Sequence, residues 1–335
     1  MENHSTVAAS TPKPPDRYLS GIQPSGELHL GNYFGAIQQH VACQTEGNSF
    51  YFIANYHALT TIHDGGRLRD LTHRVAATYL ACGLDPERSV FFRQSDVPEV
   101  TELTWLLLTA TSMGDLQRAV SYKDKVERGL PASAGLFVYP VLMAADILAY
   151  ESTIVPVGKD QVQHVEMTRS MARSFNDQYG APVFTLPKHQ LSKGAAVPGI
   201  DGAKMSKSYG NTIPLFLSGK PLKKLVMSIE TDSTSLEAPK DPNTCTVFAL
   251  YSLFADEAEQ AELTERYRAG NFGYGQAKQL LLERIERHFE DGRRRFQELI
   301  EDPAYVEDVL KAGAQKAREV ARKVTDHARA ACGVA

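Results

Sequence analysis

Short apolar runs alternate with amphipathic stretches over the first half of this 335-residue chain. The runs at 18–22, 49–55, 89–94 and 153–158 are rich in β-branched and aromatic residues and are bounded by Gly, Pro, Asn or Asp, which is typical of buried strands. The stretches between them, such as 68–83, have helical spacing. This order favours right-handed crossovers and predicts an α/β fold with a Rossmann-like, doubly wound parallel sheet, whose ligands bind at the carboxyl ends of the strands.

From about Pro214 the pattern changes, because apolar residues recur at helical spacing almost to the C-terminus. Four long stretches are expected to be helical, at 215–229, 246–270, 274–302 and 303–333. A C-terminal α-helical domain therefore follows the parallel sheet.

A chain of this length is expected to hold more than one domain. Residues 1–17 are polar and proline-bearing, and we expect a disordered tail there. Residues 18–205 are predicted to form the Rossmann domain with the main binding site. Residues 206–335 are predicted to begin with a mobile loop and to continue as the helical domain.

Charge and composition exclude several kinds of protein. The formal net charge of −4 argues against a protein that coats nucleic acid nonspecifically, so we expect no DNA partner, while a local patch for structured RNA stays open. The cysteines, Cys43, Cys82, Cys245 and Cys332, lack metal-ligand spacing and indicate reduced thiols. No secretory signal and no membrane-spanning stretch stand out, so the prediction is a cytoplasmic protein without membrane contact.

The stretch SGIQPSGELHLGNYFGAI leads from the first strand through a turn into a helix. Gly21, Gly26 and Gly31 permit close approach of a ligand, and His29 and Asn32 are donors at the helix entrance. Backbone N–H groups and the helix dipole at such a turn favour an anion. The alternative is that the glycines only make turns, Asn32 caps the helix and His29 is solvated. The segment is neither the GxGxxG dinucleotide fingerprint nor a Walker loop.

The stretch GAKMSKSYGN carries Lys204 and Lys207, three residues apart between glycines. Glycine and proline on both sides argue against a buried strand or a stable helix, so a mobile, positively charged loop is predicted. The alternative is that both are ordinary surface lysines.

Five segments resemble one family. HLGN (29–32) and KMSKS (204–208) resemble the first and second signatures of class I aminoacyl-tRNA synthetases, in the expected order. GIQPSG (21–26), YPVLMAAD (139–146) and VPVGKDQVQH (155–164) look like the tryptophanyl branch of that family. The resemblance covers the chain from its first strand to the C-terminus.

This resemblance implies a two-step ligase. The substrates would be ATP and L-tryptophan, which form an adenylate and pyrophosphate, and then tRNA(Trp), whose terminal adenosine receives the amino acid. Mg²⁺ would be held mainly by the phosphates, with no protein metal site. The helical domain would read the anticodon, and family members are homodimers, for which the apolar helix around Trp105 is a candidate contact.

Amino-acid activation is an in-line attack of a carboxylate on the α-phosphate, so positioning and charge stabilisation dominate catalysis. His29 and Asn32 would hold one end of the triphosphate, and Lys204 and Lys207 would close over the other. By resemblance Lys123 is a third phosphate contact, although on sequence grounds alone such a lysine more often lies on the solvated face of a helix. The expected ATP contacts are Gln23, Pro24, Ser25, Gly31, Asn32, Gly158, Asp160, Gln161, Lys204, Met205, Ser206, Lys207 and Ser208.

Asp146 stands inside an otherwise apolar helical run. A buried carboxylate needs a donor, and the resemblance assigns it the ring N–H of an indole substrate. The alternative is a structural Asp paired with an arginine or a helix terminus. The expected tryptophan contacts are Asp146, Met143, Tyr139, His57, Val155, Val157 and Gln161. Where relatives often carry an aromatic residue before SGIQPSG, this chain has Leu19, which puts the packing over the indole in doubt.

Two rival functions remain at this point, since a third, a small-molecule adenylyltransferase of related fold, is disfavoured by the long helical C-terminal domain. A tyrosyl enzyme of the same class would satisfy a phenol in place of an indole. A catalytically silent paralogue would bind tryptophan or RNA as a regulator, although intact HLGN and KMSKS signatures argue against it. Amino-acid-dependent ATP–pyrophosphate exchange separates all three.

Overall fold

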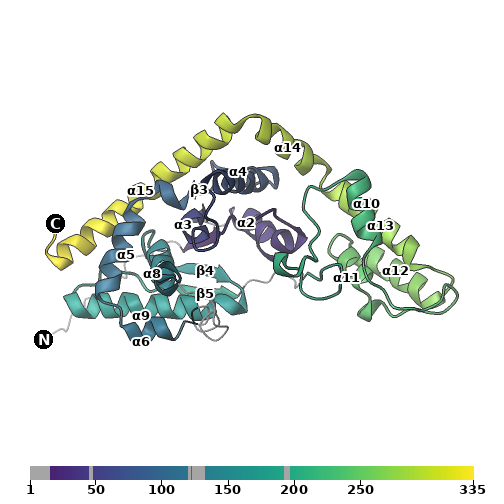
Figure 1. Cartoon of the computed structure of the whole chain (residues 1–335), viewed down its shortest axis with the longest axis horizontal. Helices are drawn as coiled ribbons and strands as arrows, with labels where there is room; N and C mark the ends of the chain where they lie inside the picture. The colour runs from purple at the N-terminus through teal and green to yellow at the C-terminus, as the bar shows by residue number, and fades with distance from the viewer. Residues whose placement is uncertain (1–15, 45–47, 120–121, 123–132, 192–196) are drawn as a thin grey trace, which may run out of the picture.

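A five-stranded, fully parallel sheet forms the centre of the molecule, in the order β3-β2-β1-β4-β5. The computed structural model describes residues 16–44, 48–119, 122, 133–191 and 197–335, with Asp160 described by its backbone alone. The strands are β1 (Arg17–Ile22), β2 (Asn48–Ile53), β3 (Val90–Arg93), β4 (Ile154–Val157) and β5 (Lys188–Leu191). The predicted Rossmann-like sheet is confirmed (Figure 1).

Only β5 was missed by the sequence pattern. Its four residues, KHQL, are all exposed and include no run of apolar side chains. The strand exists because it pairs in parallel with β4, from Ile154 opposite Lys188 to Val157 opposite Leu191. An edge strand of this kind is held by its ladder and carries no burial pattern.

Helices connect the strands and cover both faces of the sheet (Figure 1). Those of the first half are α1 (Leu30–Asn32), the π-helix η1 (Tyr33–Ile37), α2 (Gln38–Cys43), α3 (Asn55–Ala58), α4 (Gly65–Ala81), η2 (Gln94–Asp96), α5 (Glu99–Thr109), α6 (Met113–Gln117), α8 (Ala134–Leu148), η3 (Lys159–Gln161) and α9 (Val162–Tyr179). Those of the second half are η4 (Lys207–Tyr209), α10 (Gly219–Met227), η5 (Pro242–Thr244), α11 (Thr246–Ser252), α12 (Glu257–Ala269), α13 (Tyr274–His288), α14 (Glu290–Glu301) and α15 (Pro303–Cys332). Within the described part of the chain, no helix is long and apolar enough to cross a membrane.

The helices α10 to α13 pack around a core of their own, which includes Leu222, Leu250, Tyr267 and Leu281. Leu30 of α1 belongs to the same cluster of buried side chains. The helical region is therefore continuous in packing with the turn that follows β1.

The last helix differs from the expected grouping of residues 206–335, because α15 returns to the sheet (Figure 1). Ala314, Ala317 and Ala321 of α15 are buried in the same cluster as the sheet residues. A Cβ on Gly313 would lie 1.8 Å from the carbonyl oxygen of Phe91, so the glycine lets the helix lie against the backbone of β3. The helix covers an edge strand that would otherwise be open to pairing.

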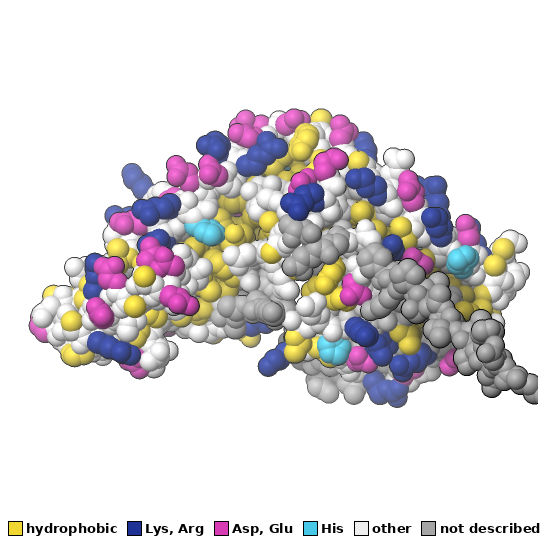
Figure 2. Space-filling view, turned by 180° about the vertical axis from the view of Figure 1, so that it is seen from behind, with side chains coloured by type: hydrophobic (Ala, Val, Ile, Leu, Met, Phe, Trp, Pro, Cys, Tyr) yellow, Lys and Arg dark blue, Asp and Glu magenta, His cyan; other side chains and the backbone are white. Residues whose placement is uncertain are grey.

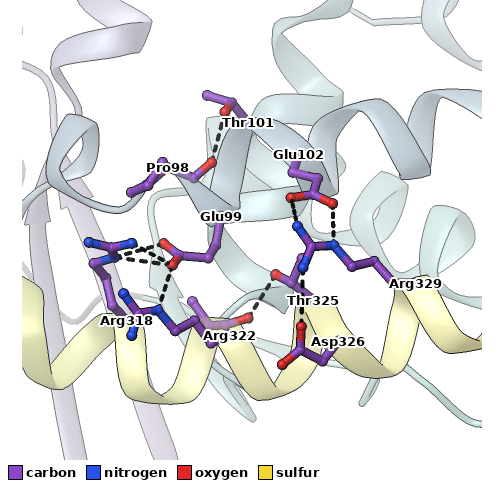
Figure 3. A network of polar contacts seen from close by, with 10 residues as sticks. Pro98, Glu99, Thr101, Glu102, Arg318, Arg322, Thr325, Asp326 and Arg329 are labelled. Atoms are coloured by element: carbon purple, nitrogen blue, oxygen red, sulfur yellow. Dashed lines mark hydrogen bonds and ion pairs between the residues drawn. The ribbon is translucent and has the colours of Figure 1, made fainter. Parts of the chain in front are cut away.

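A polar network fastens α15 to α5 (Figure 3). Glu99 accepts hydrogen bonds from Arg318 and Arg322, and Glu102 accepts two from Arg329. Burial by itself raises the pKa of Glu99, but the hydrogen bonds from the arginines outweigh it, so the pKa lies below its usual range. Bidentate arginine pairs in a network hold geometry better than isolated surface pairs do.

Basic and acidic side chains are interspersed over much of the face drawn in Figure 2. This mixture agrees with the formal net charge of −4. On this face the charges therefore form no single large field of positive potential.

Candidate active site

A cavity of about 540 Å³ opens where the carboxyl ends of β1 and β4 meet α8 and α9. Its lining contains every residue predicted for the amino-acid pocket, and it is built from seven elements and their loops. The lining residues are Leu19, Ser20, Gly21, Gln23, Phe52, Ala54, His57, Thr60, Leu136, Tyr139, Met143, Asp146, Ile147, Val155, Pro156, Val157, Gly158, Gln161 and His164. This is the position at which open parallel sheets bind ligands.

One face of α8 supplies the longest wall of the cavity. Leu136, Tyr139, Met143 and Asp146 are three or four residues apart, so they project from the same side of the helix. The Tyr139 hydroxyl is hydrogen-bonded to Nε2 of His164 on α9, which joins the two helices across the cavity.

Asp146 is buried at the end of this wall, with 1% of its surface exposed. His57 Nε2 lies 2.8 Å from Oδ2, and Nε2 of Gln94 lies 2.8 Å from both carboxylate oxygens. Burial raises the pKa of Asp146, and the hydrogen bonds from His57 and Gln94 oppose that rise. Within the described part of the chain, Asp146 pairs with His57 and Gln94 and not with an arginine or a helix terminus, so its surroundings differ from those of the structural alternative.

Gln94 was missed by the sequence reasoning. Its signal was weak: it directly follows β3 and so stands at the carboxyl edge of the sheet. Phe52 was also missed, although it lies in the apolar run of β2, one residue before its end, and lines the cavity. A Cβ on Gly21 would come within 2.4 Å of the Phe52 ring, so glycine makes room for that aromatic wall beside Leu19.

The turn after β1 holds His29 at the entrance of α1. Its backbone N–H donates to Oδ1 of Asn32 over 3.1 Å, which is the helix-capping role considered above. Burial, and then the charge of Lys207, lowers the pKa of His29 from 6.5 to about 4, so the ring is neutral at pH 7. Among the described residues, His29 Nδ1 is buried without a hydrogen-bond partner.

The two signature segments meet through backbone hydrogen bonds. Leu30 N–H donates to the carbonyl of Ile213 over 3.0 Å, and Leu215 N–H donates to the carbonyl of Leu28 over 3.0 Å. Residues 213–215 directly follow the lysine-bearing loop, so the stem of that loop is fixed against the turn after β1.

Side chains of the lysine-bearing loop also contact the turn after β1. Lys207 Nζ lies 3.4 Å from Oγ of Ser25, and its stem passes Gly26, whose φ of +146° suits glycine. Met205 is buried, and its sulfur accepts a hydrogen bond from Gly31 N–H at 3.3 Å. Burial lowers the pKa of Lys207, and the nearby Glu27 carboxylate acts in the opposite sense.

Asn211 holds the loop in its shape. Its Oδ1 accepts from the backbone N–H of Ser206 at 2.8 Å, and its Nδ2 donates to Oδ1 of Asp201 at 2.8 Å and to the carbonyl of Lys204 at 3.2 Å. Ser206 and Ser208 are hydrogen-bonded through their hydroxyls at 2.8 Å. Asn211 is buried, and the sequence reasoning did not single it out because its partners are fixed only by the folded loop.

The other predicted residues are accounted for as follows. Gln23 is exposed and donates to the carbonyl of His57 at 3.4 Å, whereas Pro24 is buried. Gly158 and Gln161 lie at the cavity, and the Lys204 side chain is exposed. Two predicted contacts, Lys123 and the side chain of Asp160, lie outside the described residues. In the described ranges no three His, Cys, Asp or Glu side chains gather as metal ligands would.

Comparison with known proteins now becomes informative. The family described as tRNA synthetases class I (W and Y) matches residues 11–290. A Rhodopirellula baltica protein named tryptophan–tRNA ligase is 53% identical over 319 residues, which cover 95% of this chain and 99% of that relative. A Campylobacter jejuni protein of the same name is 53% identical over 308 residues, covering 92% and 96%.

Solved structures agree with this. A crystal structure of tryptophanyl-tRNA synthetase from Campylobacter jejuni, complexed with ADP and tryptophan, is 51% identical with a TM-score of 0.90 and covers 95% of this chain and 99% of its own. A tryptophanyl-tRNA synthetase from Mycoplasma pneumoniae is 28% identical with a TM-score of 0.80, covering 96% and 98%.

The chain belongs to the class I tRNA synthetase family of the W and Y type. The relatives that it matches over nearly their whole length are tryptophan members of that family, which confirms the resemblance found in the sequence.

Proposed function

We propose that this protein is a tryptophan–tRNA ligase that activates L-tryptophan with ATP and transfers it to the 3′-terminal adenosine of tRNA(Trp). The observation that carries the proposal is a buried carboxylate, Asp146, in a mostly apolar cavity at the carboxyl ends of β1 and β4. Relatives of the same name at 53% identity support the same activity.

The cavity suits an indole. Met143, Val155 and Val157 supply apolar surface, and Phe52 supplies the aromatic wall that Leu19 lacks. Asp146 would accept the ring N–H, while Tyr139, His57 and Gln161 would lie along the rest of the amino acid. Phenylalanine would leave the buried acceptor without that donor, which costs more than a lost apolar contact does.

The turn and the loop suit the triphosphate. The turn after β1, with His29 and Asn32, would hold one part of it, and the ammonium groups of Lys204 and Lys207 would follow the departing pyrophosphate. A neutral His29 donates or accepts without adding repulsion toward Lys207. The other expected ATP contacts are Gln23, Pro24, Ser25, Gly158, Asp160, Gln161, Met205, Ser206 and Ser208, with Lys123 as a third lysine.

Mg²⁺ would enter with the nucleotide and be held by the phosphate oxygens, since it keeps several waters and needs few protein ligands. The residues around the turn fit this arrangement, because Lys207, Ser25 and Gly26 stand there with a single carboxylate, Glu27, and not with a set of carboxylates. When bound, the ion neutralises charge on the phosphates, and the protein's own part is to align the two substrates.

The carboxylate of tryptophan would attack the α-phosphate in line, forming an acyl–phosphate bond and breaking the bond to pyrophosphate. Negative charge grows on the leaving group in the transition state. Lys207 reaches into the site from a loop with a fixed stem, so its contact can strengthen at that point without moving the rest of the turn.

Recognition of tRNA and assembly are part of the same proposal. The region of α10 to α13 would read the anticodon, and two chains would pair through their Rossmann domains, where α5 presents Trp105 with 66% of its surface exposed. Action in the cytoplasm follows from the tRNA substrate.

Tyrosine is the competing substrate, because a carboxylate also accepts a hydrogen bond from a phenol and the matched family covers both amino acids. The experiment is ATP–pyrophosphate exchange with purified protein and each of the two amino acids. Exchange with tryptophan and little with tyrosine is expected. Exchange driven by tyrosine would refute the specificity, and exchange with neither would support a silent paralogue.

A further inference from the structure

Gln94 is buried behind the cavity wall, with 0% of its surface exposed. It begins η2 at the carboxyl end of β3, and its amide nitrogen lies 2.8 Å from both oxygens of Asp146. A fully buried glutamine is uncommon, since its amide must find partners for donor and acceptor alike.

The orientation of the Gln94 amide is fixed by its second partner. Its Oε1 accepts a hydrogen bond from the backbone N–H of Tyr56 over 2.9 Å. A backbone N–H can only donate, so the oxygen must face Tyr56 and the NH₂ group must face Asp146. The carboxylate is therefore presented with a donor.

Further hydrogen bonds join the segment of Gln94 to the helix that carries His57. Asn55 Nδ2 donates to Oγ of Ser95 over 2.8 Å, and the backbone N–H of Ser95 donates to Oδ1 of Asn55 over 3.1 Å. His57 Nε2 meets Oδ2 of Asp146 at 2.8 Å. The two groups that hold Asp146 thus stand on elements, η2 and α3, that are bonded to each other.

On its outer side η2 is fixed to α15. Arg93, which precedes Gln94, pairs with both carboxylate oxygens of Glu307 at 2.8 and 2.6 Å and with Asp96 at 2.9 Å. Gln94 is consequently held on two sides. Its amide bonds to Tyr56 and Asp146, and its neighbour Arg93 bonds to α15.

The carboxylate of Asp146 can accept more hydrogen bonds than its described partners donate, and this indicates a role in binding a ligand. Among the described residues, Oδ2 meets both His57 and Gln94, whereas Oδ1 meets only Gln94, and a carboxylate oxygen accepts about two hydrogen bonds. Asp146 lines the cavity, so one acceptor position on Oδ1 is left for a ligand.

We propose that Gln94 is a positioning residue that holds Asp146 as an oriented acceptor, so that the cavity selects substrates by a ring N–H. This inference rests on the proposed function, because it requires tryptophan as the substrate. The selection then depends on the hydrogen-bonded group of Gln94, Asp146 and His57 and not on one carboxylate.

The test compares L-tryptophan with its analogue in which sulfur replaces the ring N–H, in ATP–pyrophosphate exchange. The ratio of the two kcat/KM values measures selection by the N–H group. In Gln94→Met, which keeps an unbranched side chain of similar length, kcat/KM for tryptophan should fall at least about 30-fold and that for the sulfur analogue no more than about threefold. The KM for ATP should be unchanged.

Gln163→Met is the matched control, because Gln163 is exposed on α9 and should leave the ratio as in the wild type. A double variant adds a second readout. If Gln94 acts through Asp146, then Gln94→Met added to Asp146→Asn should lower the ratio no further. If the ratio in the double variant fell by the product of the two single effects, Gln94 would act on its own, which would overturn the inference.

Gln94→Glu is measured beside Gln94→Met in case the latter fails to fold. It keeps the shape and the acceptor for Tyr56, but it replaces the amide donor with a carboxyl group that either repels the Asp146 carboxylate or shares a proton with it, so the fixed donor is lost and the ratio should fall as well. An unchanged ratio in either folded variant overturns the inference while the wild type still exchanges with tryptophan. Absent exchange in the wild type refutes the proposed function itself, which is a different result.

Discussion

The two halves of the site are built in different ways. On the amino-acid side, Asp146 is buried and held by three contacts of 2.8 Å from buried or half-buried groups. On the phosphate side, backbone hydrogen bonds fix the stem of the loop, but the Lys207 ammonium reaches the turn by one contact of 3.4 Å.

This difference matches two chemical tasks. An indole is rigid and does not change during adenylation, so an acceptor fixed in advance selects it best. The phosphates move and gain charge along the reaction, so a compact cation on a flexible stem serves them better. Variants on the two sides should therefore affect different kinetic constants.

The largest effect is expected on the phosphate side. Lys207→Ala should lower the single-turnover rate of adenylate formation by about 1,000-fold, because its contact strengthens in the transition state. Tryptophan affinity, measured by equilibrium binding, should change less than about twofold. Lys223→Ala, an exposed lysine of α10, is the control. Equal losses in rate and affinity would remove the proposed separation of the two sides.

On the other side, Asp146→Asn should lower kcat/KM for tryptophan by about 100-fold, because the amide offers a donor where an acceptor is needed. Steady-state exchange measures this, and the KM for ATP should stay within about twofold. Asp177→Asn, an exposed position on α9, should behave as the wild type. A change confined to the KM for ATP would contradict the assignment of Asp146.

A moderate effect is expected for the residue that shapes the loop. Asn211→Ala removes the bonds to Ser206, Asp201 and the Lys204 carbonyl, and kcat for exchange should fall about tenfold because Lys207 is no longer presented. Asp201→Ala removes one of these partners and should lose less. If both variants kept the full rate, the loop would not need its folded shape.

The smallest effect concerns pH. His29 has a pKa of about 4 in the folded chain and 6.5 as a free group, so the unfolded chain binds more protons between these values. The contribution of His29 to the free energy of unfolding should be complete above about pH 6.5 and should be lost as the pH falls toward 4. The expected loss is on the order of 1 kcal/mol, because water at the turn screens the effect. Denaturant titrations of wild type and His29→Gln at several pH values measure the difference. Burial also lowers the pKa of His40 to about 4, but His40 is present in both proteins, so its contribution cancels in the comparison. Identical pH profiles would contradict a buried neutral His29.

The difference between the amino-acid side and the phosphate side also explains which site residues could be predicted from the sequence. The phosphate side was accessible, because glycines at fixed spacing and two lysines between glycines are local signals, and so was the apolar helix bearing Asp146. The partners of Asp146 were not, since Gln94 on η2 and His57 on α3 follow separate strands, β3 and β2, that become neighbours only in the sheet.

Two fold features escaped for a similar reason. β5 carries no apolar run, and its existence depends on the ladder with β4. The return of α15 to the sheet depends on Gly313 fitting against the backbone of Phe91, which no helical periodicity reports. Tertiary contact, and not local pattern, settles such elements.

The most direct measurement is a crystal structure with L-tryptophan and a nonhydrolysable ATP analogue bound. The account predicts the indole nitrogen at about 2.7–3.2 Å from Oδ1 of Asp146, and the Lys207 ammonium within about 3 Å of a β- or γ-phosphate oxygen. An indole turned away from Asp146, or a lysine loop that cannot reach the phosphates, would contradict it.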